Sequence, residues 1–190
     1  MGQWLEVLYD VLFHPKSAMI HIAGNRLSGQ GLAVFLLSVF LPGAAFFLAT
    51  QESAFTAVTA AAYMICSLLL WLTGTALLHL IAELYGGQGK VTSLLAALGF
   101  SQLPRLFIVP FWLTTALFSD TIRTIAMGAA VLAIIVWILV LHVKALEATY
   151  GFSSTKAILV LITPFLACGA LVLMVVAFVT AHLVPWPQWG

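Results

Sequence analysis

Long apolar segments separated by a few charged residues dominate the pattern of this chain. No charged residue lies between Arg26 and Glu52, or between Glu52 and Glu83. About 20 apolar residues cross the hydrocarbon core of a bilayer as a helix. The pattern therefore predicts an all-α fold, a polytopic membrane helical bundle with five transmembrane helices in one domain over residues 1–190. The expected spans are 31–50, 55–82, 103–119, 125–143 and 157–181.

The third span is the hardest to assign, because the uncharged stretch between Arg105 and Asp120 is short for a crossing. If it crosses, Arg123 alone faces the outside. The basic residues that then share the other side are Lys16, Arg26, Lys90, Arg105, Lys144 and Lys156. If it does not cross, Lys144 and Lys156 change sides. The positive-inside rule favours the crossing, with a cytoplasmic N-terminus and an external C-terminus. In that topology, Arg105 would snorkel to the membrane surface.

Residues 3–13 have the polar and apolar spacing of an amphipathic helix within a cytoplasmic or interfacial segment, residues 1–28. Gln3, Glu6 and Asp10 share one face. The opposite face carries Trp4, Leu5, Leu8, Val11 and Leu12. This pattern predicts an interfacial helix that lies flat on the bilayer, with a partner-binding helix as the alternative. The His14-Pro15 pair should end it, because proline is tolerated in a first helical turn but not in an interior.

The widest polar interruption begins at His79 and extends to Arg105, and its pattern returns in weaker form from His142 to Lys156. Both copies have His, Glu, Tyr-Gly and Lys in that order. The first copy has His79, Glu83, Tyr85-Gly86 and Lys90, and the second has His142, Glu147, Tyr150-Gly151 and Lys156. Because each copy would follow a span that ends in the cytoplasm, the chain resembles a parallel repeat of span pairs.

Glycines and a proline shape the first copy of this repeated turn. Gly86, Gly87 and Gly89 should let the chain leave the helix, because glycine enters left-handed backbone conformations freely. The next residues, from Val91 to Gln102, predict a short helix that lies along the membrane surface before the third span. Pro104 should then open that span after an extended turn.

Composition narrows the class of protein. Hydrophobic residues make up 63% of the 190 residues and charged residues only 7%, which excludes a soluble domain. The net charge of +1 gives no basic stripe, so we expect no nucleic-acid partner. Cys66 and Cys168 lie in apolar runs and are interpreted as small hydrophobic residues. Glu6 and Asp10 occupy the place where a signal peptide would be basic, so we expect no cleavable signal.

The ionisable residues near the ends of two spans are His79, Glu83, His142 and Glu147. Such residues cost about 2.5–3.5 kcal/mol at the centre of a bilayer and are functional candidates by default. His79 and Glu83 share a helical face at spacing i, i+4. If the second and fourth spans are neighbours, the four side chains would form a polar cluster. That cluster suits a divalent metal held by His79 and His142, or a proton relay.

A purely structural role is the alternative for the same residues. Glu83 and Glu147 would then pair with basic side chains at the surface, and the histidines would form hydrogen bonds between helices. The basic candidates are Lys90, Lys144 and Arg105. Catalysis has no support, because the chain has no HExxH, GxSxG, P-loop or GxGxxG motif and no serine with an identifiable base. We therefore expect neither an enzyme nor a resident cofactor.

Two segments are similar to a known family. AELYGGQGKVTSLLAALGFSQLPRLF (82–107) resembles the Yip domain family of Ypt-interacting proteins, in which a span ends at Gly-Gly and a Gly-aromatic-x-x-x-Pro stretch opens the next. WILVLHVKALEATYGFSSTKAILVLITP (137–164) looks like the family's ending. The residues that carry the motifs are Tyr85, Gly86, Gly87, Lys90, Gly99, Phe100, Pro104, Tyr150, Gly151 and Lys156.

The resemblance implies a five-span membrane protein with a cytoplasmic N-terminus, similar to the short bacterial branch of that family. It implies a bacterial inner membrane and a periplasmic C-terminus, but no settled activity. The long cytosolic region of eukaryotic members does not precede the first span here, so their Rab-type GTPase partnership is not carried over.

We therefore expect a small non-enzymatic protein that organises the membrane or partner proteins through its cytoplasmic face. Its expected partners are membrane lipids, a second copy in a homo-oligomer and a protein on the cytoplasmic face. The alternative is an oligomeric transporter or channel that moves a cation or proton past the His/Glu cluster. A lipid-handling protein is a third hypothesis, and it requires a polar groove that is open to lipid.

Overall fold

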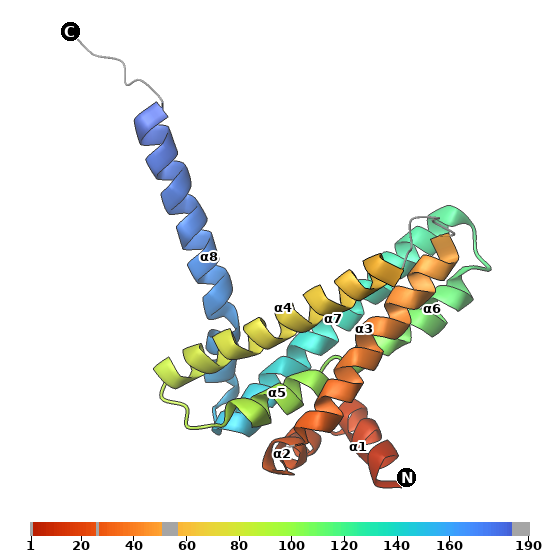
Figure 1. Cartoon of the computed structure of the whole chain (residues 1–190), viewed down its shortest axis with the longest axis horizontal. Coiled ribbons are helices and arrows are strands. Elements are labelled where there is room, and N and C mark those ends of the chain that lie inside the picture. Colours follow the sequence, from red (N-terminus) through yellow and green to blue (C-terminus); the bar gives the residue numbers. More distant parts are fainter. Residues whose placement is uncertain (1, 26, 51–56, 184–190) are drawn as a thin grey trace.

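The computed structural model describes residues 2–25, 27–50 and 57–183, which are helical apart from short turns (Figure 1). The elements are α1 (Gly2–Phe13), α2 (Pro15–Asn25), α3 (Ser28–Thr50), α4 (Ala57–Leu84), α5 (Val91–Phe100), the 3₁₀ helix η1 (Leu103–Phe107), α6 (Ile108–Thr115), α7 (Asp120–Tyr150) and α8 (Ser154–Leu183). Five segments are long and apolar enough to cross a membrane. The all-α class and the five candidate spans are therefore confirmed. Arg26 and the expected start of the second span at residue 55 lie outside the described residues.

The N-terminal amphipathic segment forms α1, and Pro15 starts α2 after a break at His14. Proline suits a first helical position, where its missing N–H has no intrahelical acceptor. Most of the predicted apolar face turns toward the bundle. Val11 is fully buried, and Leu8 and Leu12 pack with it. Leu5 of that face is exposed and forms an outward stripe with Tyr9 and Phe13, which were not part of the prediction. The face of α1 available to lipid is therefore this stripe.

The expected short helix before the third span is present as α5, and most of its side chains are buried within the protein. Its residues from Leu94 to Phe100 are buried, apart from the partly buried Leu95. The reason is composition, since α5 has small side chains and no charged residue. Ser93, near its start, donates a hydrogen bond to the Ala23 carbonyl of α2 at 2.8 Å. The candidate third span consequently combines α5, η1 and α6 over Val91–Thr115, and not 103–119 as expected.

Glycine allows α3 and α5 to cross with their backbones in contact. A Cβ atom added to Gly31 would lie 2.6 Å from the Ala96 carbonyl oxygen. A Cβ atom added to Gly99 would overlap the Gly31 carbonyl oxygen and lie 2.6 Å from its carbonyl carbon. Small residues at helix crossings are the usual means of close packing in lipid, where packing and not water exclusion holds helices together.

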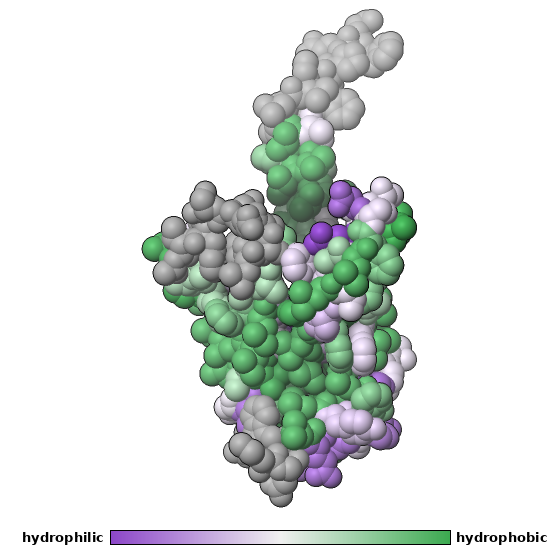
Figure 2. All heavy atoms as spheres, turned by 90° about the vertical axis from the view of Figure 1, so that its right-hand side faces the viewer, coloured by the Kyte–Doolittle hydropathy of each residue, from purple (hydrophilic) through white to green (hydrophobic). Residues whose placement is uncertain are grey.

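The largest buried cluster joins α2, α5, α7 and the first turns of α8, with Phe100, Met19 and Leu146 among its fully buried side chains. A smaller cluster joins α3 to α4 through Phe35 and Trp71, whose rings stack at 4.5 Å. Figure 2 shows apolar side chains over the middle of one face, with hydrophilic side chains below and near the top. This banding is the expected surface of a membrane protein.

The last helix, α8, leaves the bundle. Its N-terminal part packs on α4 and α7 through the buried Ala157 and Val160. From Phe165 to Thr180 every side chain is exposed. Figure 1 shows the blue helix pointing away from the other spans.

Candidate functional site

Both copies of the repeated turn end a helix with glycine in a left-handed conformation. Gly86 has φ +79° and Gly151 has φ +68°. After α4, the Gly87 N–H donates to the Ala82 carbonyl at 2.9 Å and the Gly86 N–H to the Glu83 carbonyl at 2.8 Å. This pair of bonds is a Schellman motif, which satisfies the last carbonyls of a helix. The Gly151 N–H donates to the Glu147 carbonyl at 2.9 Å, so glycine ends α7 in the same role.

The two copies pack directly against each other. A Cβ atom added to Gly87 would lie 2.6 Å from Tyr150 Cδ1 and 2.8 Å from Phe152 Cζ. One added to Gly89 would lie 2.6 Å from the Thr149 carbonyl oxygen. Gly87 and Gly89 do not have positive φ angles, contrary to the prediction that they release the chain from the helix. They are needed because the aromatic residues of the second copy cover them.

His79 joins the two copies by side-chain bonds. Its Nδ1 lies 2.5 Å from the Tyr150 hydroxyl oxygen, and its Nε2 lies 3.3 Å from Glu83 Oε1. A carboxylate can only accept, so Nε2 carries a proton, and in the neutral ring Nδ1 accepts from the tyrosine hydroxyl. The chain of Tyr150, His79 and Glu83 therefore connects the ends of α4 and α7.

The second histidine belongs to another network. His142 Nδ1 lies 2.7 Å from the Ile138 carbonyl oxygen and 3.3 Å from the Ser101 hydroxyl oxygen. Glu147 accepts two hydrogen bonds of 2.9 Å from Lys144 Nζ. Across the described ranges, no group of three or more His, Cys, Asp and Glu side chains is placed to hold a metal ion. The four residues of the predicted His/Glu cluster therefore belong to separate networks. This arrangement resembles the structural alternative, except that Glu83 pairs with His79 and not with a lysine or arginine.

The remaining motif residues have structural contacts. Tyr85 Oη lies 3.3 Å from Thr163 Oγ1 on α8, and Lys156 Nζ lies 4.6 Å from the centre of the Phe152 ring. Lys90 is exposed and immediately precedes α5. Pro104 is buried in the first turn of η1, where no amide donor is required. The remaining motif residue, Gly99, forms the crossing with α3 described above.

Charged residues gather where α4 and α7 end and where α5 and α8 begin. We call this region the turn end, and its charged members are Lys16, Glu83, Lys90, Lys144, Glu147 and Lys156. A cavity of about 550 Å³ lies here between α2, α7 and the turn into α8. Lys16, Lys144 and Glu147 line it together with Ser153 and Ser154. The turn end therefore presents a concave surface with both signs of charge.

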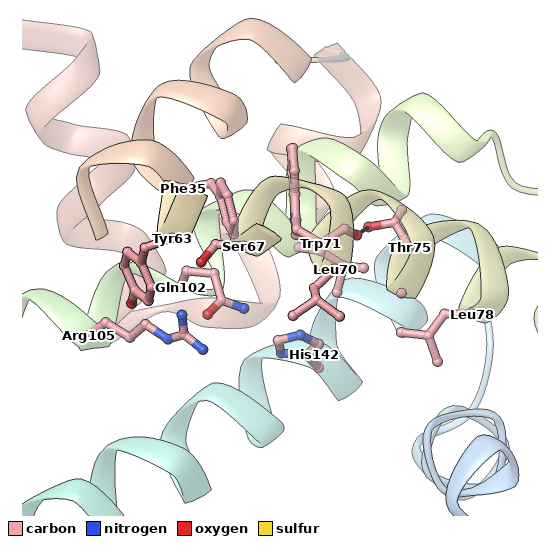
Figure 3. A pocket seen from close by; sticks show the side chains of 12 residues that line it. Phe35, Tyr63, Ser67, Leu70, Trp71, Thr75, Leu78, Gln102, Arg105 and His142 are labelled. Atoms are coloured by element: carbon pink, nitrogen blue, oxygen red, sulfur yellow. Dashed lines mark hydrogen bonds between the residues drawn. The ribbon is translucent and has the colours of Figure 1, made fainter. Parts of the chain in front are cut away.

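A second cavity, of about 420 Å³, lies inside the bundle between α3, α4, α7 and the segment around η1. Figure 3 shows the Arg105 guanidinium, the Gln102 carboxamide and the His142 imidazole facing one another, below α4. Tyr63 and Ser67 of α4 also line this space. We call it the arginine cavity.

The sequence pattern does not predict this cavity. The predicted topology has Arg105 snorkelling to the membrane surface, whereas its side chain faces the cavity. One signal was present in the sequence, because Tyr63, Ser67 and Thr75 recur at intervals of four and eight residues and so share a face of the second span. Nothing in the sequence pairs that face with Gln102 and Arg105.

Comparison with known proteins gives one match. The family model for the Yip1 domain matches residues 9–177. No curated protein and no solved structure matches the chain. The matched range extends from α1 into α8 and includes both copies of the turn.

Proposed function

Because the chain belongs to the Yip1-domain family of multi-pass membrane proteins, we propose that it is a non-enzymatic protein that organises the membrane or partner proteins through the turn end. The observation that supports this role most directly is the charged concave surface between α2, α7 and the start of α8. The tight packing of Tyr150 over Gly87 and Gly89 holds this surface in place. A preformed concave surface suits docking, because little order has to be gained on binding.

The distribution of basic residues supports a cytoplasmic turn end. Lys16, Lys90, Lys144 and Lys156 lie there, while Arg123 lies near the opposite end of α7. Cytoplasmic loops carry the excess of lysine and arginine. The inner membrane of a bacterium and a periplasmic C-terminus belong to the same proposal, and the family resemblance alone supports the bacterial location.

The orientation can be tested by cysteine labelling in intact cells. Cys66 and Cys168 would be replaced by alanine, and a single cysteine introduced by Ser153→Cys or Thr121→Cys. Both positions are exposed, at opposite ends of α7. A membrane-impermeant maleimide should label the Thr121→Cys variant in intact cells and the Ser153→Cys variant only after lysis. The reverse pattern would contradict the orientation.

The partner role can be tested by photo-crosslinking in living cells, with a photoreactive amino acid at Ser153 and, as the matched control, at Thr121. We expect a discrete adduct from position 153 alone, to a protein partner or to a second copy of the chain. The Lys16→Glu substitution should weaken that adduct, because it reverses a charge beside the cavity. Equal adducts at both ends, or no protein adduct at position 153, would refute the proposal.

Transport of a cation or proton past a His/Glu cluster is less well supported. That hypothesis needs His79 and His142 in one pathway, whereas His79 bonds Tyr150 and His142 bonds the Ile138 carbonyl. Flux into proteoliposomes that is lost in the His79→Ala/His142→Ala variant, with the fold retained, would restore it.

A further inference from the structure

The arginine cavity lies at the middle of the spans. Trp71, which lines it, is the central residue of the candidate span Val58–Leu84. Arg105 lies within the candidate span Val91–Thr115. An arginine at the centre of a bilayer costs about 2.5–3.5 kcal/mol on insertion scales, so such residues normally have a partner. Arg105 is therefore expected to have a partner in the cavity, and an anion would compensate its charge most fully.

The described part of the chain supplies no such group. Among the described residues that line the cavity, none is aspartate or glutamate. The carboxylates that form ion pairs do so elsewhere, with His14, His79 and Lys144 as their partners. Among residues 2–25, 27–50 and 57–183, no ion pair to Arg105 is formed. Within the described residues, the guanidinium therefore faces neutral side chains.

Next to this charge is a buried polar group without a partner. Gln102 is 7% exposed, and its Oε1 atom has no hydrogen-bond partner in the part of the chain that the structure describes. Figure 3 shows its carboxamide between Arg105 and His142, directed into the cavity. A buried polar atom left without a hydrogen bond costs about 1–3 kcal/mol, so an unpaired atom at this position indicates a ligand group that bonds it.

His142 adds a second acceptor. The Ile138 carbonyl can only accept, so the 2.7 Å contact places a proton on Nδ1. In the neutral ring Nε2 is then an acceptor, and it makes no hydrogen bond within the described residues. The cavity thus combines one strong anion-binding group with two neutral acceptors, Gln102 Oε1 and His142 Nε2.

We propose that the arginine cavity binds the headgroup of a membrane phospholipid. The phosphate would bond the Arg105 guanidinium, which forms paired hydrogen bonds with phosphate oxygens. The headgroup hydroxyl or ammonium would donate to Gln102 and His142. A lipid source is favoured over a soluble anion because the cavity borders the lipid-facing surface. Leu70 and Tyr63, which line it, are 73% and 43% exposed.

This inference is independent of partner binding at the turn end. It is tested with the full chain in detergent, by native mass spectrometry during titration with phosphatidylglycerol or phosphatidylethanolamine. We expect one phospholipid per chain at saturation. Arg105→Gln should weaken binding about tenfold or more, the effect of losing charge-assisted hydrogen bonds. Arg123→Gln is the matched control, because Arg123 stacks on the Trp112 ring outside the cavity and should not affect this binding.

Further measurements test whether the phosphate is recognised and whether it comes from a lipid or from a soluble anion. Diacylglycerol lacks the phosphate and should not compete, and inorganic phosphate and glycerol phosphate should not displace the lipid. Displacement by either soluble anion would overturn the lipid assignment, and equal binding of diacylglycerol would overturn the role of the phosphate. Unchanged phospholipid affinity in a folded Arg105→Gln variant would refute the site itself. If that variant does not fold, Gln102→Leu takes its place, and an undiminished affinity there has the same meaning.

Glu52, outside the described residues, provides the last control. If the chain's own carboxylate occupied the cavity, Glu52→Gln would open it and increase the affinity for phospholipid. An increase of tenfold or more would overturn the proposal, and an unchanged affinity supports it.

Discussion

Replacement of Gly99 by alanine tests the crossing of α3 and α5. The new Cβ atom would overlap the Gly31 carbonyl oxygen, with the Gly31 carbonyl carbon at 2.6 Å and its Cα at 2.9 Å. Carbon atoms pack best at about 3.5–4.0 Å. The two helices must therefore separate by about 1 Å, because the three atoms nearest to the methyl group all belong to the Gly31 backbone and cannot rotate away as a side chain could.

The expected cost follows from this separation. Extra methyl groups in a packed core cost about 1–3 kcal/mol, and the rigid backbone on both sides places this site at the upper end. Alanine also regains about 1 kcal/mol of helix propensity. The net loss of unfolding free energy should then be about 2 kcal/mol. The control is Gly128→Ala in α7, where nothing lies within 4 Å of the new Cβ atom, and that variant should be neutral or slightly stabilised.

The assay is equilibrium unfolding in mixed micelles of dodecyl maltoside and SDS, followed by circular dichroism. Gly99→Ala should unfold at a lower SDS fraction than the wild type, and Gly128→Ala should not. The Gly31→Ala/Gly99→Ala pair should cost less than the sum of its parts, because the second methyl group enters a gap that the first has opened. If Gly99→Ala and Gly128→Ala unfold at the same SDS fraction, the close contact between α3 and α5 is wrong.

Further predictions concern the turn end. Tyr150→Phe should lower the unfolding free energy by about 0.5–1.5 kcal/mol in the same assay, because His79 loses its hydrogen bond to the hydroxyl group; a stability equal to that of the wild type would contradict this. Gly151→Ala should cost about 1–2 kcal/mol, because alanine is strained at φ +68°, whereas Gly169→Ala in an open part of α8 should cost nothing. Zinc titration should reveal no site that the His79→Ala/His142→Ala variant removes, since the histidines have separate partners; stoichiometric zinc lost in the folded double variant would overturn that assignment.

The sequence pattern was sufficient for four spans and for two helix ends. Gaps between charged residues located four of the five apolar segments, because the requirement for uncharged length does not depend on the fold. The third candidate span contains Arg105, and its bounds were not predicted. Gly86 and Gly151 could be placed at helix ends from local chemistry alone. Both inferences depend only on neighbouring residues in the sequence, and not on contacts between distant segments.

Features that depend on contacts between distant segments could not be predicted. The composition of α5 suits either a membrane surface or a protein interior, and only the approach of Gly31 shows that it is buried. His79 and His142 occupy similar positions in the repeat, but Tyr150 contacts one and the Ile138 carbonyl contacts the other. The arginine cavity forms only when α3, α4, α7 and the segment around η1 are correctly aligned along their lengths. No sequence pattern shows that alignment.

The exposed side chains of α8 from Phe165 to Thr180 make the bilayer an important determinant of its tilt. Its candidate span of 27 residues is about 40 Å long, whereas the hydrocarbon core is about 30 Å thick. A helix with such an exposed C-terminal part can relieve the mismatch by tilting, here by about 40°. Because its first turns are packed on α4 and α7, a thicker bilayer would make the helix more upright and a thinner one would increase its tilt. The last span would then work as a gauge of membrane thickness, and its tilt, measured by solid-state NMR in short- and long-chain lipids, should differ between the two.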